Sequence, residues 1–214
     1  MKKLKKIAAL LLACSLVLAF AACGKSGPDA TGTWSLKMDL SQAMKEELGS
    51  EFAGFEAPFV FTIYLDLNKD GSYKMYVDEK ETEQDMDTFM SAFADFFTEY
   101  LYSAMEAQGV DRTTAQTALE AQFGMSVKDY AFQTIKESMD IASLTESLVQ
   151  EGVYEVKGGK LYMGETKINK QVYDLVTIEG DKMTLNLAAD AAASPFMNES
   201  IPGVSYPFEL TKIK

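Results

Sequence analysis

Residues 57–77 of the chain read APFVFTIYLDLNKDGSYKMYV, and this stretch decides the fold class. One apolar face recurs at every second position on both sides of a turn: Phe59, Phe61, Ile63, Leu65, Leu67, then Tyr73, Met75 and Val77. A period of two predicts strands with one buried face. For Leu67 and Tyr73 to share that face, residue 68 must pair with residue 72. The loop is then Lys69-Asp70-Gly71, a three-residue hairpin with glycine in the left-handed conformation.

Strands of the same kind are predicted on both sides of this hairpin. Residues 32–40 alternate with Trp34, Leu36 and Met38 on one face, and a short helix follows over residues 41–48. After residue 152, two hairpins turn at Gly158-Gly159 and Gly180-Asp181. The paired residues are Tyr154 and Val156 with Leu161 and Met163, and Val176 and Ile178 with Met183 and Leu185. A last strand spans residues 206–210, where Pro207 indicates an edge or a bulge.

Residues 81–150 change to a helical pattern. Apolar residues recur at spacings of three and four over residues 86–105, which predicts a long amphipathic helix. Residues of the types that begin or end helices follow it: Gly109, Asp111, Gly124, Ser126 and Asp140. The sequence therefore predicts an α+β fold. An antiparallel eight-stranded meander, closed as a barrel or strongly curled, occupies residues 32–214, with a helical insertion between strands 3 and 4.

The strand pattern carries a family resemblance. Eight meandering strands that open with Gly32-x-Trp34 resemble the lipocalin-like domains of bacterial lipoproteins, because G-x-W begins the first strand of lipocalins. Other segments that resemble these domains are 152–154, 159–162, 180–185 and 208–212. The resemblance covers residues 32–78 and 152–213 and omits the helices. Lipocalins also carry a Thr-Asp-Tyr turn and a late arginine over the tryptophan, neither of which occurs here. The resemblance implies a barrel that binds an apolar small molecule.

Residues 1–22 have the three zones of a secretory signal. Four lysines are followed by an apolar run over residues 7–20, and Ala21-Ala22 precede Cys23. The run is about 14 residues long, whereas a span of the bilayer core needs about 20. Phe20-Ala21-Ala22-Cys23 resembles a bacterial lipobox, in which the cysteine is acylated and becomes the first residue. A rival lipobox ending at Cys14 would leave an apolar run of only about six residues, below the usual 7–15.

This reading predicts a lipid-anchored protein on the extracytoplasmic face of the cell membrane. Residues 23–31 would form a lipidated tether, since residues 24–29 are short and polar. Two or three acyl chains on Cys23 would meet the requirement that stable anchoring takes more than one chain. The anchored domain would begin at residue 32.

Composition excludes several classes of function. Of the 20 Lys and Arg residues, four lie in residues 1–22; the remaining 16 face 32 Asp and Glu, which gives a net charge of −16. That charge disfavours nucleic acid and anionic lipid head groups as partners. The chain has no histidine, and its only cysteines are Cys14 and Cys23. These absences remove Ser-His and Cys-His nucleophiles and the commonest transition-metal ligand. We therefore expect a non-enzymatic protein without cofactor or metal.

Two acidic segments resemble calcium sites but have simpler interpretations. Residues 66–71 match the first half of an EF-hand loop, yet the twelfth position is Val77 instead of glutamate. A polar hairpin turn is the favoured interpretation. The acidic run is Asp78, Glu79, Glu81, Glu83, Asp85 and Asp87. Weak calcium binding is one interpretation of the run. The favoured one is the solvated start of a helix, where acidic residues complement the helix dipole.

The leading hypothesis is a lipoprotein that binds an apolar small molecule. Its cavity would be lined by Phe59, Phe61, Ile63, Tyr73 and Met75, and closed by the helix face that carries Phe93, Phe97 and Tyr100. The alternative for that helix face is packing against the sheet or the other helices. A second hypothesis is a protein-interaction or structural surface module with a filled core. That module would instead expose an apolar patch of several hundred Å².

Overall fold

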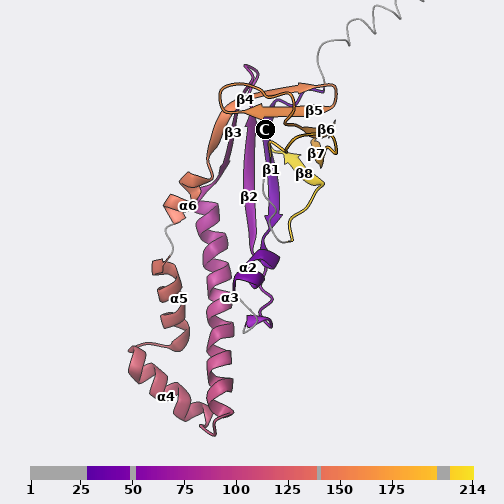
Figure 1. The fold of residues 1–214 in the computed structure, drawn as a ribbon. Helices are drawn as coiled ribbons and strands as arrows, with labels where there is room; N and C mark the ends of the chain where they lie inside the picture. The colour runs from indigo at the N-terminus through magenta and orange to yellow at the C-terminus, as the bar shows by residue number, and fades with distance from the viewer. Residues whose placement is uncertain (1–27, 49–51, 139–140, 197–202) are drawn as a thin grey trace, which may run out of the picture.

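The computed structural model describes residues 28–48, 52–138, 141–196 and 203–214. Eight antiparallel strands follow one another around a closed barrel, and the helices between strands 3 and 4 project from one end of it (Figure 1). The strands are β1 (Gly32–Asp39), β2 (Val60–Leu67), β3 (Ser72–Val77), β4 (Gln150–Lys157), β5 (Lys160–Gly164), β6 (Asp174–Glu179), β7 (Lys182–Leu187) and β8 (Phe208–Lys212). The predicted α+β fold class is confirmed.

Five helices accompany the barrel in the described part of the chain. They are α2 (Ser41–Leu48), which follows β1, and α3 (Glu79–Glu106), α4 (Arg112–Phe123), α5 (Val127–Ser138) and α6 (Ile141–Ser147), which form the insertion. None of the helices in the described residues is long and apolar enough to cross a membrane. The predicted signal segment and the lipobox cysteine Cys23 lie outside the described residues.

The predicted hairpin registers are confirmed. The Asn68 amide donates to the Ser72 carbonyl at 2.9 Å, and Gly71 has a φ of 85°, a backbone conformation that favours glycine. Val156 pairs with Leu161, and Ile178 pairs with Met183. Alternation and turn chemistry therefore set the strand registers locally, as the sequence indicates.

The last strand departs from the prediction. It begins at Phe208, after the cis Tyr206–Pro207 peptide bond, because proline has no N–H to donate to a strand ladder. The strand is no free edge, since it closes the barrel against β1. That closure is short: Trp34 pairs with Lys212 and Ser35 with Thr211, and backbone hydrogen bonds continue it at Thr33, which accepts from the Ile213 amide and donates to the Lys214 carbonyl.

The barrel interior is filled by the predicted alternating face. Trp34 is fully buried, and its indole N–H donates to the Ala30 carbonyl at 2.8 Å. Around it pack buried residues from the other strands, among them Leu65, Leu161, Met183, Leu185 and Leu210. Ala30 belongs to the same cluster. Packed structure therefore begins at residue 30, two residues before the expected start of the domain at residue 32.

A second core joins the barrel to the helices. The inner face of β2 and β3 continues past the barrel end, where Phe61 and Val77 pack against Met86, Phe89 and Met90 of α3. Asp78 caps α3 by accepting from the Glu81 amide. The first part of the amphipathic face, from Met86 to Met90, is thus buried against the sheet.

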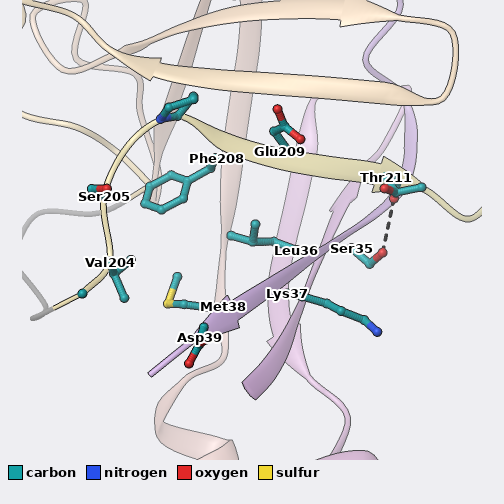
Figure 2. A pocket seen from close by; sticks show the side chains of 12 residues that line it. Ser35, Leu36, Lys37, Met38, Asp39, Val204, Ser205, Phe208, Glu209 and Thr211 are labelled. Carbon is teal, nitrogen blue, oxygen red and sulfur yellow. Dashed lines mark hydrogen bonds between the residues drawn. The ribbon is translucent and has the colours of Figure 1, made fainter. Parts of the chain in front are cut away.

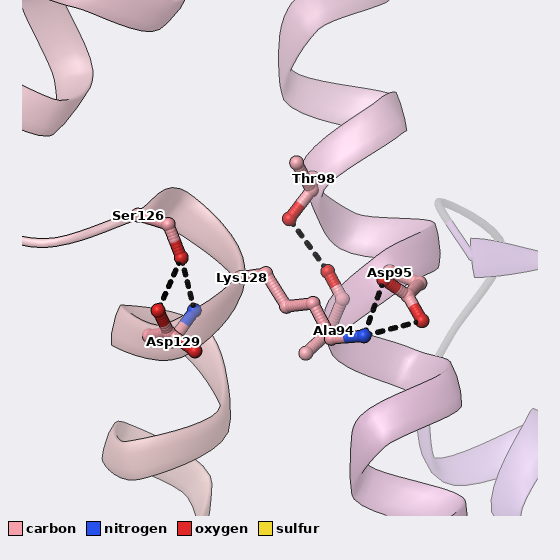
Figure 3. Close-up of polar contacts among 6 residues, drawn as sticks. All are labelled: Ala94, Asp95, Thr98, Ser126, Lys128 and Asp129. Atoms are coloured by element: carbon pink, nitrogen blue, oxygen red, sulfur yellow. Dashed lines mark hydrogen bonds and ion pairs between the residues drawn. The ribbon is translucent and has the colours of Figure 1, made fainter.

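The outer part of the insertion is a thin helical arm. α3 has 28 residues and is about 42 Å long at 1.5 Å per residue, with α4 and α5 alongside it (Figure 1). Ser126 begins α5 by accepting from the Asp129 amide at 3.0 Å, and Lys128 reaches across to Asp95 of α3 (Figure 3). Asp111 and Gly124 bound α4 as predicted.

Candidate functional site

The residues predicted to line a barrel cavity divide between the two cores. Tyr73 and Met75 lie in the barrel core, whereas Phe59 and Phe61 lie in the core shared with α3. Ile63 packs against both. The Phe59 ring is 4.7 Å from the Phe89 ring, centre to centre. The structure thus surrounds these side chains with other side chains of the same chain and does not gather them around one space.

The predicted lid residues do not cover the barrel. Phe93 and Phe97 lie along the arm, with Phe52 from the segment before β2 packed against them at ring distances of 5.4 and 6.3 Å. Phe52 also contacts Tyr100 at 5.7 Å, and Tyr100 is 41% exposed. We call this set of four residues the arm aromatic cluster.

The candidate binding site lies at the seam where the barrel closes. After the two pairs that join them, β1 and β8 diverge and leave a pocket of about 710 Å³. Its walls come from residues 35–39 of β1 and from residues 203–205, 207–209 and 211. Figure 2 shows Leu36, Met38 and Phe208 between the two segments. The volume falls within the range of about 300–1,000 Å³ that small-molecule sites occupy.

The seam pocket has an apolar floor and a charged rim. Leu36, Met38 and Phe208 are buried members of the barrel core, so side chains of that core form the floor of the pocket. The rim side chains Lys37, Asp39 and Glu209 are exposed. Period-two alternation produces this arrangement, because neighbouring residues of one strand point to opposite faces. Such a lining suits a molecule with an apolar body and a polar end.

A buried polar cluster lies beside the seam, next to the segment that forms one wall. The Asp174 carboxylate accepts from the Ser194 hydroxyl at 2.9 Å and from the Tyr206 hydroxyl at 3.1 Å. Burial raises the pKa of Asp174, and burial together with this carboxylate raises the pKa of Tyr206. Asp174 is fully buried, and none of the three residues lines the seam pocket. Their role is to attach the segment before β8 to β6.

Sequence reasoning missed this cluster, although one signal pointed to it. Asp174 shares strand parity with Val176 and Ile178, so an acidic residue stood at an inward position. A buried carboxylate needs hydrogen-bond partners. Those partners came from the irregular segment at 188–206, whose path is not encoded by a local period.

The acidic run serves the fold. Glu81 accepts from the Thr62 hydroxyl at 2.8 Å and from the Tyr64 hydroxyl on the outer face of β2. The bond to Glu81, with burial as a lesser cause, raises the pKa of Tyr64 to about 12. Asp87 pairs with Lys136 of α5 at 2.9 Å. In the EF-hand-like turn, Asp70 accepts from the Ser72 amide at 2.9 Å.

These contacts leave the acidic side chains engaged with their own chain. No group of three or more acidic, histidine or cysteine residues is arranged to hold a metal among the residues that the structure describes.

Lipocalins carry a late arginine over the tryptophan. In this chain a lysine lies over the tryptophan instead. The Lys212 ammonium lies 5.3 Å from the centre of the Trp34 ring, within the range of a cation–π contact. Lys212 is in β8 and Trp34 in β1, and these two residues pair where the barrel closes. The contact spans nearly the whole length of the chain, so no local pattern could reveal it.

Comparisons of the chain with models of protein families, with curated proteins and with solved structures gave no match. The interpretation of the seam pocket therefore depends on its own geometry and chemistry.

Proposed function

We propose that this chain is an extracytoplasmic lipoprotein, anchored through Cys23, that binds an apolar small molecule with a polar end at the β1–β8 seam. The observation that carries the proposal is the seam pocket, whose floor is the barrel core at Leu36, Met38 and Phe208. An acyl or ring system would displace water from this floor, at about 25 cal/mol for each Å² of apolar surface buried. The charged rim would hold the polar end.

Binding without chemical reaction is the role that the available side chains favour. The sequence has no histidine, the commonest general base. The carboxylate with a raised pKa, Asp174, is fully buried and does not line the pocket. The rim charges of Lys37, Asp39 and Glu209 are exposed, which suits recognition of a polar end. We therefore propose a binding protein whose ligand binds in the open seam between β1 and β8, against the filled barrel core.

Native mass spectrometry of the chain from residue 24, before and after organic extraction, tests the proposal. We expect an additional mass that extraction removes. Val204→Trp places a large ring in the seam pocket, which Val204 lines in a half-buried position, and should abolish that mass. Ile213→Trp adds the same ring at a position 49% exposed outside the pocket and should retain it. Equal retention in both variants would place the ligand elsewhere.

The anchor has its own test. Cys23→Ala removes the residue proposed to carry the acyl chains, so the variant should leave the membrane fraction for the soluble extracytoplasmic fraction. The parent chain should incorporate radiolabelled palmitate and the variant should not. Incorporation of palmitate by the variant would contradict the anchor without bearing on the seam pocket.

One observation favours a second function, the binding of a protein partner. The arm aromatic cluster places Phe52, Phe93 and Phe97 in half-buried positions beside the exposed ring of Tyr100. Exposed aromatic surface is typical of interaction sites. If native spectra show only the bare chain, and if crosslinking through a photoreactive group at position 100 captures a defined partner, the arm replaces the seam as the functional site.

A further inference from the structure

The charge of the molecule is distributed unevenly between its two ends. Residues 79–147, which hold helices α3 to α6, contain 14 acidic and four basic residues, a net charge of −10. The opposite end of the barrel is formed by strand ends and tight turns. It comprises residues 28–32, 67–72, 157–160, 179–182 and 212–214. We call this the turn end. It carries six lysines against Asp29, Asp70, Glu179 and Asp181, a net charge of +2.

Three of these lysines surround one pocket at the turn end. Lys69, Lys212 and Lys214 line a space of about 410 Å³ between the start of β1 and the β2–β3 turn, together with one acidic residue, Asp66. Two of the three positions are fixed by the fold. Lys212 lies over Trp34, and the Lys214 carbonyl accepts from the Thr33 amide at 3.1 Å.

The close approach of the lysines depends on Gly32. A Cβ atom at this position would lie 2.5 Å from the Lys212 Cε and 2.5 Å from the Lys214 carbonyl oxygen, so a side chain there would displace both. Nearby, Asp29 has a lowered pKa, chiefly because Thr31 donates hydrogen bonds to it and also because Lys212 and Lys69 are near. The G-x-W motif thus supports a positively charged pocket as well as the barrel core.

The turn end is also where the chain leaves toward the proposed anchor. Residue 28 is five residues from Cys23, and five extended residues span at most about 18 Å. If Cys23 carries the lipid, as proposed above, residue 28 is held within that distance of the bilayer surface, and the start of β1 follows four residues later. The helices lie at the other end of the barrel (Figure 1).

We propose that the turn end is a docking surface for anionic phospholipid head groups, with a head-group phosphate bound among Lys69, Lys212 and Lys214. The domain then stands on the membrane with its acidic arm directed outward. The overall negative charge does not prevent this contact. The Debye length is about 10 Å at 0.1 M salt, and the arm, about 42 Å long, extends away from the surface. The local lysines therefore determine the interaction.

Vesicle co-sedimentation of the chain from residue 24 tests the docking surface without the anchor. The buried residues of the described cores lie between residues 30 and 210, so this chain keeps the described fold. We expect it to sediment at low salt with vesicles of phosphatidylglycerol and phosphatidylcholine, and not with phosphatidylcholine alone. Because one lysine near an anionic surface contributes about fivefold, replacing Lys69, Lys212 and Lys214 by glutamine should weaken binding about 100-fold.

A matched variant controls for net charge. Lys45, Lys80 and Lys167 lie on α2, α3 and the β5–β6 connection, away from the turn end, and their replacement by glutamine changes the charge equally. This variant should bind within about twofold of the parent. Absence of binding by the parent, or equal loss in both variants, would overturn the proposal. Incorporation of palmitate by the parent and not by the Cys23→Ala variant tests only the anchor, so the two failures remain distinguishable.

Discussion

The barrel and the outer arm bury their residues very differently. In the barrel, Trp34, Leu65, Leu161, Met183 and Leu185 are completely inaccessible, and every strand contributes to one cluster. Beyond the junction with β2, the arm has a small core of Tyr102, Ala115 and Val127, and Ala115 is the buried residue of α4. Stability depends on buried apolar area, so it should be concentrated in the barrel and fall along the arm.

The contacts that hold the arm together explain this difference. Salt bridges join α5 to α3 through Lys128 and Lys136, and Arg112 of α4 pairs with Glu99. The side chains in these pairs are between 38% and 61% exposed, and ion pairs so exposed contribute little. The barrel is held by a ladder that links distant segments, whereas the arm is held by helices that neighbour one another in sequence.

The largest expected effect is the contrast between two aromatic truncations. Trp34→Ala removes the central ring of the barrel core and should lower the free energy of unfolding by about 3–5 kcal/mol. Tyr102→Ala removes a ring from the small arm core and should leave the barrel transition unchanged. Instead, it should increase amide exchange in α4 and α5. Urea denaturation and hydrogen exchange measure the two effects. A similar loss of barrel stability in both variants would mean that the arm and barrel unfold as one unit.

An intermediate effect is expected at the buried acid. Asp174→Ala removes the acceptor for two buried or half-buried hydroxyls and should cost about 1–3 kcal/mol. Urea denaturation at neutral pH measures it. Asp174 holds Tyr206, which lies on the segment that forms one wall of the seam pocket. Loss of this bond should therefore increase the rate at which a ligand dissociates from the seam pocket, if the ligand binds there. An unchanged unfolding midpoint would show that the cluster contributes nothing.

Asp174 should also make stability depend on pH. Burial raises its pKa, so the folded chain holds this proton more tightly than the unfolded chain. Its contribution to stability is complete below the ordinary pKa of 3.8 and is lost as the pH rises through the raised value. Asp174→Asn stays neutral. Its stability relative to the parent should therefore increase as the pH rises from about 4, and a constant difference would contradict a raised pKa.

The smallest expected effect is at the ion pair of the arm. Lys136→Gln removes the partner of Asp87, a carboxylate that raises the pKa of this lysine by accepting its hydrogen bond. The barrel transition should not change. Amide exchange in α5 should become slightly faster at low salt, and the difference should vanish in 1 M salt, where the Debye length is about 3 Å. A lasting difference at high salt would indicate packing of the lysine stem on Phe132.

The same difference explains which features of the candidate site could be predicted from the sequence and which could not. The inner positions Phe59, Phe61 and Ile63 were correctly assigned to one face of β2, since a period of two determines which residues share a face. This face extends past the end of the barrel, so Phe59 and Phe61 pack against α3. Phe93, Phe97 and Tyr100 were expected to close the barrel, but they lie on the arm, where Phe52 packs against them. Local periods do not encode how far one element extends along another.

Local sequence patterns were enough to predict the strands, their hairpin registers and the helix caps at Asp111 and Ser126. Each depends on residues within a few positions of one another, through side-chain alternation, glycine turns and capping side chains. Only the tertiary structure decided where the barrel closes. That closure joins Ser35 to Thr211, opens the seam pocket below them, and brings Lys212 over Trp34 beside Lys69. These contacts depend on the cumulative twist and stagger of eight strands, which no short stretch of sequence contains.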